Sequence, residues 1–398
     1  MSVVINTNPT GQPSVHDNMW HVVSSDNSGQ IDFKYVFDVW INGVQKIRVK
    51  QFPEPDSGKG YFDAGPIVRN SMIYAWFEPL DNTVMVDQPD MSGQIGIVYA
   101  IRVGEDYSGL TTTNMASGQV SGYNWAPPMF GRRVVTLADK LNKWLTNRPL
   151  TGNSWRDYTT TDRGENLYIG FYTDKTSLTM HVESFNQSNA VEDTAAPIVI
   201  PVTGPGFLQM NIGPNGILAG EFGGFTLEER VKYYEVWFTS GATTYDKFRV
   251  YLTCNPKYDC IPIHFLNRWG MYDTQRFDLV SKLSMDITRK DFGKRDYEFN
   301  GNSVDYMSSS NRYYEGRINY SNKGLWTYKL TADAMTDAEW EWIADLMQSP
   351  QILMEVDGYF YPVTIKKNSY DYNKFVNDRL KPLEIEFEMN SARMTQLR

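Results

Sequence analysis

The sequence is poor in the residues that build metal and disulfide sites. Its 398 residues include two cysteines and four histidines. Cys254 and Cys260 could close a small loop or supply half of a metal site. A zinc site needs about four ligands, however, and one pair of cysteines does not make a disulfide framework. We therefore expect both thiols to be reduced. His16 and His21 lie in an irregular stretch rather than on one helix face, so we also expect no metal site and no cofactor.

Long apolar runs and clustered positive charge are also missing. No run of about 18 apolar residues occurs, so we expect no membrane-spanning segment. The first residues, Met1–Asn6, have neither the charged start nor the apolar centre of a signal peptide. The net charge is −9. It excludes a chain that grips nucleic acid with its whole surface, because phosphate binding needs clustered lysine and arginine.

Recognisable catalytic motifs are absent from the sequence as well. The glycine-rich stretch 204–225 lacks the Gly-Lys-Ser/Thr ending of a phosphate-binding loop, and no Gly-x-Ser-x-Gly elbow occurs. Glu183, Glu235 and Asp246 lie near aromatic residues in expected strands, as the acids of a sugar-cleaving cleft would. Their spacing does not distinguish them from surface acids, so we predict that the chain is not an enzyme.

The sequence is rich in aromatic residues. They make up 14% of the chain, with 25 tyrosines and 20 phenylalanines, while hydrophobic and charged residues make up 41% and 21%. Half-exposed aromatic surfaces suit strands and interfaces with proteins or sugars. A chain of this length can bury the cores of two or three domains.

We predict a mainly β chain with two short helices, made of an N-terminal β-sandwich region and a C-terminal α+β module. Residues 1–19 are polar and interrupted by proline and glycine, so we expect an arm rather than a folded element. The β-sandwich region spans residues 20–256. Its clearest hairpin joins residues 33–41 to residues 44–49 through Asn42-Gly43, a pair that tolerates the positive φ angles of a type I′ turn.

Two features interrupt the β-sandwich region. Gly104–Gly131 has no sustained periodicity, so we expect a long loop that reaches a neighbouring subunit or stays on the surface. Thr136–Leu145 carries an apolar stripe with helical spacing, and Pro149 prevents its continuation. This pattern predicts a helical insertion at residues 134–148.

The C-terminal module spans residues 257–398. Thr336-Asp-Ala-Glu339 is a capping box, which predicts a helix over Thr336–Gln348 with Trp340 on its buried face. Asp357-Gly358 predicts a hairpin between the two strands that follow. The module therefore combines one capped helix with paired strands.

Three stretches of the chain carry a family resemblance. The first is Trp20-His-Val-Val-Ser-Ser-Asp-Asn-Ser-Gly-Gln-Ile-Asp-Phe-Lys-Tyr-Val-Phe-Asp-Val39. The second is His264-Phe-Leu-Asn-Arg-Trp-Gly-Met-Tyr-Asp273, with Arg289-Lys-Asp-Phe-Gly-Lys294 downstream. The third is Leu353–Met389. Together they cover both ends and the middle of the chain, which resembles virion proteins of tailed phages that infect Bacteroidota, including crAss-like phages.

The resemblance implies a non-enzymatic structural subunit of a tail, baseplate or head–tail neck, assembled as a homo-oligomeric ring. It implies other tail or neck proteins as partners and the passage of genomic DNA through the ring. The chain would be synthesised in the cytoplasm of the host bacterium and reside in the virion. In such a ring, an arm or strand edge of one subunit meets a different patch on the next subunit.

The candidate site residues are therefore interface and channel residues. Arg268, Trp269, Asp273 and Trp340 are the candidates for the subunit interface. Leu383–Met389 alternates apolar residues with glutamate, so we expect one buried face and one acidic face. The acidic face could line a channel that repels DNA and lets it slide, or it could be a solvated outer face. Its members are Glu384, Glu386 and Glu388.

An alternative function is a glycan-binding β-sandwich protein, either a phage receptor-binding part or a bacterial surface lectin. In this interpretation, tryptophan and tyrosine rings stack on sugars. The missing secretion signal favours the phage version.

Overall fold

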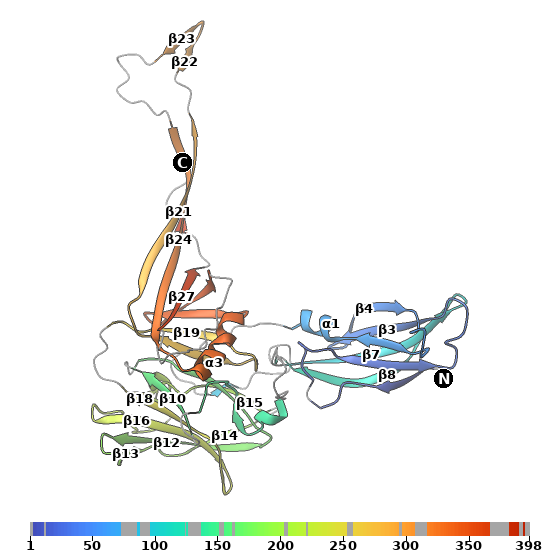
Figure 1. The fold of residues 1–398 in the computed structure, drawn as a ribbon, viewed down its shortest axis with the longest axis horizontal. Helices are drawn as coiled ribbons and strands as arrows, with labels where there is room; N and C mark the ends of the chain where they lie inside the picture. Colours follow the sequence, from blue (N-terminus) through green and yellow to red (C-terminus); the bar gives the residue numbers. More distant parts are fainter. Residues whose placement is uncertain are drawn as a thin grey trace. The chain divides into compact units, whose positions relative to one another are not determined.

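The computed structural model describes residues 3–11, 13–72, 86–87, 96–123, 125, 137–150, 155–160, 164–202, 206–219, 222–252, 258–293, 297–306, 317–366, 382–389 and 393–394. The chain is mostly β, with several antiparallel sheets and three α-helices among these residues (Figure 1). The prediction of a mainly β chain is confirmed.

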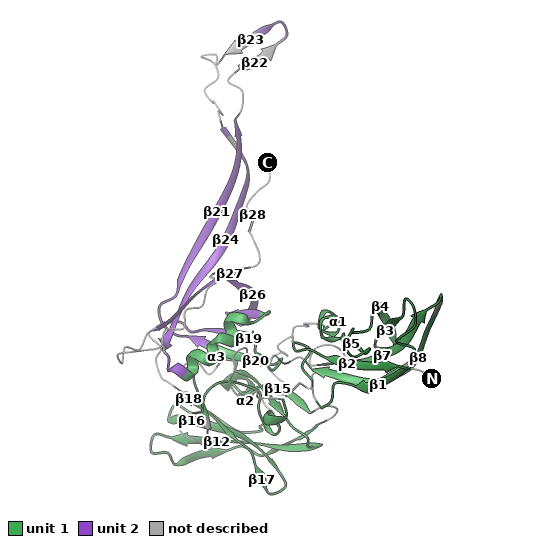
Figure 2. Cartoon of the chain, turned by 45° about the vertical axis from the view of Figure 1, so that its right-hand side comes forward, with its two compact units in different colours: residues 1–256, 264–275, 338–351 green, residues 257–263, 276–337, 352–398 purple. Residues whose placement is uncertain are grey.

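The chain divides into two compact units (Figure 2). Unit 1 comprises residues 1–256, 264–275 and 338–351, and unit 2 comprises residues 257–263, 276–337 and 352–398. The predicted module 257–398 therefore contributes two segments to unit 1. One of them carries the Trp/Arg/Asp cluster and the other carries the C-terminal helix.

The first sandwich of unit 1 has two sheets that share one core. One sheet has the order β1-β2-β5 and the other the order β4-β3-β7-β8. The core contains Val23 and Phe62 from the first sheet and Tyr35, Phe37 and Tyr99 from the second. The strands are β1 Val3–Thr7, β2 Trp20–Ser25, β3 Lys34–Ile41, β4 Val44–Gln51, β5 Gly60–Asp63, β7 Gly96–Tyr107 and β8 Leu110–Tyr123; the short helix α1 covers Gly65–Asn70.

The predicted hairpin at Asn42-Gly43 is confirmed. β3 and β4 pair antiparallel, and the two turn residues have φ angles of 49° and 76°. These are the positive angles that a type I′ turn requires at both central positions.

The predicted N-terminal arm is wrong. Val3–Thr7 forms strand β1, which pairs antiparallel with β2. Val15 and Met19 are fully buried in the core of the first sandwich. Polar residues and turn formers dominate residues 1–19, but a few apolar side chains are sufficient to fasten the segment to the sheet.

The loop predicted over Gly104–Gly131 is also wrong where the structure describes it. Residues 104–107 continue β7, and β8 returns beside it through a turn at Ser108-Gly109. Gly104 lies at a register shift, and a Cβ atom there would lie 1.4 Å from the carbonyl oxygen of Thr112. Residues 124 and 126–131 lie outside the described residues. The small polar residues of β8 give too weak a hydrophobic alternation to reveal a strand in the sequence.

The second sandwich of unit 1 has its own core. One sheet has the order β10-β18-β16-β12-β13, with β14 and β17 beside it, and the other has the order β6-β15-β11-β9. Met180, Tyr234 and Phe238 of the first sheet meet Phe171 and Leu208 of the second. The elements are β6 Val86–Asp87, β9 Lys143–Trp144, β10 Trp155–Thr160, β11 Tyr168–Tyr172, β12 Ser177–Asn186, β13 Val191–Thr194, β14 Ile198–Pro201, β15 Phe207–Asn211, α2 Pro214–Leu218, β16 Val231–Ser240, β17 Thr243–Thr244 and β18 Lys247–Leu252.

The helix predicted over Thr136–Leu145 is wrong in its described part. Leu137–Lys140 forms a 3-10 helix, and Lys143–Trp144 forms β9, which pairs with β11. Trp144 is fully buried in the second sandwich, whereas Leu145 packs into a separate cluster with Leu137. Neighbouring side chains thus point to opposite sides, as in a strand. Tertiary packing of Trp144 outweighs the helical spacing of the leucines.

The remaining elements belong to the C-terminal third. Strands β19 Ile261–Leu266 and β20 Tyr272–Phe277 are each divided between the units. Helix α3, Asp337–Gln348, confirms the predicted helix, although Trp342, Ile343 and Leu346 form its buried face and Trp340 is half-buried. The strands are β21 Lys282–Gly293, β22 Tyr297–Asn300, β23 Ser303–Tyr306, β24 Arg317–Ala334, β25 Ile352–Val356, β26 Tyr359–Ile365, β27 Pro382–Met389 and β28 Arg393–Met394.

The larger antiparallel sheet of unit 2 includes the strand order β25-β26-β27-β24-β21, with β28 beside β24, and β22 and β23 pair as a separate hairpin. The predicted turn at Asp357-Gly358 is confirmed, with φ angles of 53° and 76° between β25 and β26. In β27, Leu383, Ile385 and Phe387 are buried, so the predicted alternation is also confirmed.

Candidate functional site

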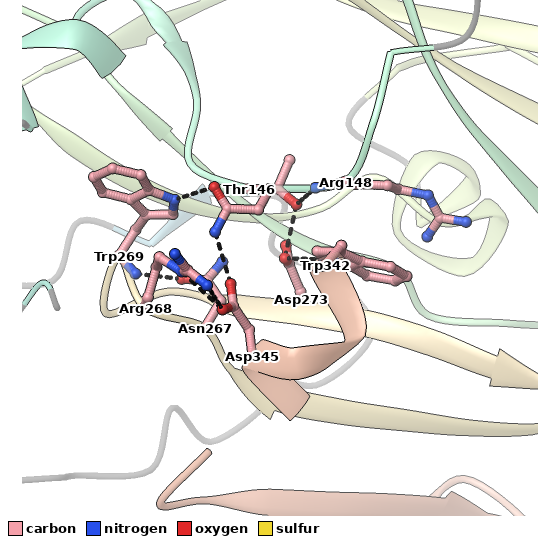
Figure 3. Close-up of polar contacts among 9 residues, drawn as sticks. Thr146, Arg148, Asn267, Arg268, Trp269, Asp273, Trp342 and Asp345 are labelled. Atoms are coloured by element: carbon pink, nitrogen blue, oxygen red, sulfur yellow. Dashed lines mark hydrogen bonds and ion pairs between the residues drawn. The ribbon is translucent and has the colours of Figure 1, made fainter. Parts of the chain in front are cut away.

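Two features of the structure are candidates for function: a buried polar network in unit 1 and a long β-ribbon arm in unit 2. In the network, Arg268 binds Asp345 of α3 through Nε at 2.7 Å and Nη2 at 2.5 Å (Figure 3). Asn147 donates its side-chain amide to the other oxygen of Asp345 at 2.7 Å. The side chain of Asp345 is 3% exposed and that of Arg268 is 26% exposed. These contacts hold α3 against the other segments of unit 1.

Asp273 is the second anchor of the network (Figure 3). Its Oδ2 atom accepts hydrogen bonds from Thr146 Oγ1 at 2.7 Å and from Trp342 Nε1 at 2.9 Å. The guanidinium of Arg148 lies 4.6 Å from the Trp342 ring centroid. Burial raises the pKa of Asp273 to about 6, although the hydrogen bonds from Trp342, Thr146 and Asn267 act in the opposite direction. The carboxyl is therefore held in an environment that disfavours its charge.

The network shows which of the four predicted interface residues are buried within the chain. Trp269 and Asp273 are 3% and 2% exposed within the chain itself. The indole of Trp269 donates to Asn147 at 3.1 Å. We therefore correct the assignment of these two: their side chains stabilise unit 1 and offer no surface to a neighbour. For the partly exposed Arg268 and Trp340 the interface role stays a prediction.

The raised pKa of Asp273 predicts a pH-dependent stability. Ionisation costs the folded state more than the unfolded state, so the contribution of Asp273 to the free energy of unfolding should fall as the pH rises from about 4 to about 6, by at most about 3 kcal/mol.

His21 changes stability in the opposite direction. Burial lowers its pKa to about 4, so the contribution of the neutral imidazole to the free energy of unfolding is lost as the pH falls from about 6.5 to about 4.

Comparison with Asp273→Asn isolates the Asp273 effect, because the amide oxygen can still accept hydrogen bonds and carries no charge. We expect the wild-type chain to lose unfolding free energy relative to this variant between pH 4 and pH 6. Urea unfolding across that range measures the difference. A difference that is constant with pH contradicts the prediction.

The predicted channel residues lie on the solvent-facing side of β27. Glu384 is exposed, and Glu386 and Glu388 are half-buried. Lys329 of β24 lies 2.8 Å from Glu384 Oε1, and this hydrogen bond raises the pKa of the lysine. Lys366 binds Asp286 of β21, and its pKa is raised first by that hydrogen bond and further by the charges of Glu386 and Glu388. This face therefore carries both positive and negative side chains, and its role in a channel stays a prediction.

The opposite side of the same sheet continues outward as an apolar stripe. Leu283 of β21 lies opposite Tyr328 of β24, and Tyr328 lies opposite the buried Phe387 of β27. Directly opposite residues share a face, so Leu283, Met285 and Ile287 extend the core face of unit 2. They are 48%, 41% and 48% exposed. We call these three residues the arm stripe.

The arm that carries the stripe consists of β21 and β24, which continue as a paired ribbon past the end of β27, with β28 paired to β24 at Lys323 and Gly324 (Figure 2). All twelve residues of β21 are exposed. Among the described strands, β21 pairs with β24 alone and ends the strand order, so its outer edge presents unpaired backbone groups. A ribbon of so few strands buries little apolar surface by itself, and a neighbouring surface over the stripe would stabilise it.

The sequence interpretation missed this arm. The signal was present, because Lys282-Leu-Ser-Met-Asp-Ile-Thr288 alternates polar and apolar residues with the period of a strand. The alternation predicts one buried face. It does not reveal that this face stays nearly half-exposed among the described residues.

Two of the three acids considered for sugar cleavage share one sheet face, and one of them is paired with cations. Glu183 and Glu235 lie opposite each other on β12 and β16. Glu235 binds Lys247 Nζ at 2.7 Å and Arg249 Nη2 at 2.6 Å. Burial raises the pKa of Glu235, but these hydrogen bonds outweigh it and the pKa lies below its usual value. A carboxyl held ionised by two cations is unsuited to donate a proton.

His21, considered as a metal ligand, lies in the core of the first sandwich. Its Nδ1 atom contacts Asn8 Oδ1 at 2.9 Å and its Nε2 atom contacts the Tyr99 hydroxyl at 3.0 Å. Both nitrogens are therefore used by hydrogen bonds within the fold. Across the described ranges, no group of three or more His, Cys, Asp or Glu residues is placed to hold a metal ion. Cys260 accepts a hydrogen bond from Arg276 Nε at 3.0 Å, and Cys254 lies outside the described residues.

Comparisons with known proteins add little to this description. No protein-family model and no curated protein matches the chain. A crystal structure of the N-terminal eight Ig domains of Down Syndrome Cell Adhesion Molecule (DSCAM) isoform 1.30.30 overlaps 83% of this chain at 10% identity, with a TM-score of 0.15. The chain spans about half the length of that structure, 48%. A TM-score this low carries no argument about function. No helix in the described part of the chain is long and apolar enough to cross a membrane.

Proposed function

We propose that the chain is a non-enzymatic structural subunit of a tailed-phage virion that assembles with copies of itself into a ring of the tail, baseplate or neck. The arm is the observation that supports this proposal most directly. It exposes an apolar stripe and an open strand edge on a ribbon of few strands, which further contacts would stabilise. A neighbouring subunit would supply those contacts.

The arm also has a form suited to a heterologous interface. In a ring, the surface that projects from one subunit meets a different surface on the next. The arm belongs to unit 2, and its stripe is formed by every second residue of a single strand, β21. Such a narrow stripe fits a groove or sheet face of a partner better than a copy of itself.

Particle incorporation tests the proposal. We expect an epitope-tagged chain to be found in purified phage particles in several copies, and the purified chain to form rings visible by negative-stain microscopy. A chain that is absent from particles and stays monomeric at micromolar concentration contradicts the proposal.

The channel prediction has its own test. Replacing Glu384, Glu386 and Glu388 together by Gln leaves Lys329 and Lys366 with fewer neighbouring negative charges. If this face lines the channel, it then attracts the DNA backbone, and we expect slower DNA ejection from particles that still assemble.

The control for this test replaces exposed acids of the first sandwich, Asp26 and Asp56, by Asn. We expect normal ejection from the control particles. Ejection that is equally fast with the glutamine variant would instead place this strand on a solvated outer face.

A further inference from the structure

We propose that the outer face of the β1-β2-β5 sheet binds a neutral glycan, with Trp20 and Tyr61 as stacking rings and Asp63 as an acceptor for sugar hydroxyls. This binding activity goes beyond the proposed assembly function. It rests on residues of the first sandwich, which the arm and the network do not use.

The two rings lie on the solvent side of neighbouring strands. Trp20 of β2 is opposite Asp63 of β5, and Val22 is opposite Tyr61. Directly opposite residues of an antiparallel pair share a face, so all four side chains lie on the outer side. Trp20 is 47% exposed and Tyr61 is 37% exposed. The alternate residues of the same strands, His21, Val23 and Phe62, are buried in the core.

Asp63 is fixed in place beside the exposed indole. Its Oδ1 atom accepts the backbone N–H groups of Met19 at 2.7 Å and Gly65 at 2.9 Å. Its Oδ2 atom accepts no hydrogen bond from the residues that the structure describes. A carboxylate that is already oriented loses little freedom when it accepts a hydroxyl, which favours binding.

The surroundings of the rings favour a sugar over a protein partner. Polar groups lie on the same face: Ser57 Oγ lies 3.5 Å from the Tyr61 hydroxyl, and Ser24 Oγ, two residues beyond Val22 on β2, hydrogen-bonds Asn6 Oδ1 at 3.2 Å. A specific protein interface needs roughly 800 Å² on each partner, which two rings and small apolar neighbours do not supply. A sugar ring presents an apolar C–H face to an aromatic ring and hydroxyls to its polar rim.

The charge of this face selects the class of glycan. Asp63 lies within it and Glu54 lies close to it, because both Glu54 and Tyr61 contact Ser57. Carboxylates at the site repel sialylated or uronic-acid sugars and accept hydrogen bonds from neutral ones. The site therefore fits neutral oligosaccharides.

The test uses the full chain on an array of neutral and acidic oligosaccharides, followed by calorimetry with the neutral oligosaccharide that binds best. We expect Trp20→Ala to weaken binding by about tenfold or more, and Tyr61→Ala and Asp63→Asn to weaken it several-fold. The matched control is Phe52→Ala, which removes a 63% exposed ring that follows β4 in the other sheet. It should bind as the wild-type chain does. Thermal unfolding checks that every variant is folded.

Four results would overturn the proposal: no array binding by the folded wild-type chain, binding confined to acidic sugars, binding that is unchanged by Trp20→Ala, or a loss of protein association instead of glycan binding in that variant. Failure here is separable from failure of the assembly function. Trp20→Ala should still be incorporated into particles, because the arm is unchanged.

Discussion

Met285→Glu combined with Ile287→Glu should leave the chain folded and abolish its assembly. Both side chains are nearly half-exposed on the arm stripe, so the substitutions create no cavity in unit 2. In an assembled ring the stripe would be covered, and each apolar side chain would then contribute about 1 to 2 kcal/mol of burial free energy. Two buried carboxylates would reverse that contribution. Light scattering coupled to size-exclusion chromatography measures the loss of oligomers.

The arm offers an internal control for this experiment. Ser284→Glu combined with Thr288→Glu places the same charges on the same strand but on its opposite, polar face, and Thr288 lies opposite Lys323. We expect this variant to assemble normally. If both variants assemble, or both fail, the stripe is not the interface. If the stripe variant lowers the melting temperature without a change in mass, the stripe is covered within the chain itself.

Asp345→Ala should destabilise unit 1 by about 3 kcal/mol. Removing one partner of a buried ion pair typically costs about 3 to 5 kcal/mol because the other charge stays buried. The lower figure applies here, since the side chain of Arg268 is 26% exposed and retains some contact with water. The variant also removes the acceptor of the Asn147 amide. Urea unfolding followed by tryptophan fluorescence measures the change.

Two substitutions control for effects on the helix itself. Gln348→Ala changes an exposed residue at the end of α3 and should alter stability by less than about 0.5 kcal/mol. Asp345→Asn keeps one acceptor oxygen and should fall between the wild-type chain and Asp345→Ala. Equal stability of Asp345→Ala and Gln348→Ala would show that the network contributes nothing to the fastening of α3.

Local patterns in the sequence were sufficient for several elements. Asn42-Gly43 and Asp357-Gly358 both predicted hairpins, because few residue pairs adopt two successive positive φ angles without strain. The alternation of Leu383–Met389 predicted its buried and exposed faces. The pattern misled at Thr136–Leu145, where helical spacing is present but a partner strand and a core position for Trp144 decide the structure.

The candidate site was less accessible to sequence reasoning. The cluster from His264 to Asp273 is conspicuous, and its chemistry suggested an interface. Its partners Asn147 and Asp345 are 198 residues apart, and no local pattern shows that they meet. Two predicted interface residues are internal: Asp273 is buried against Thr146 and Trp342, and Trp269 is buried with its indole on Asn147.

The amino-acid sequence by itself determined the mainly β character of the protein, the two hairpin turns at Asn42-Gly43 and Asp357-Gly358, and the two faces of Leu383–Met389. These properties depend on φ preferences and on a period of two residues, which are local. Only the tertiary structure decided which apolar faces are covered. The stripe of β21 has the alternation of a buried strand, but the residues that the structure describes provide no layer over it, since coverage depends on contacts between distant segments and between molecules.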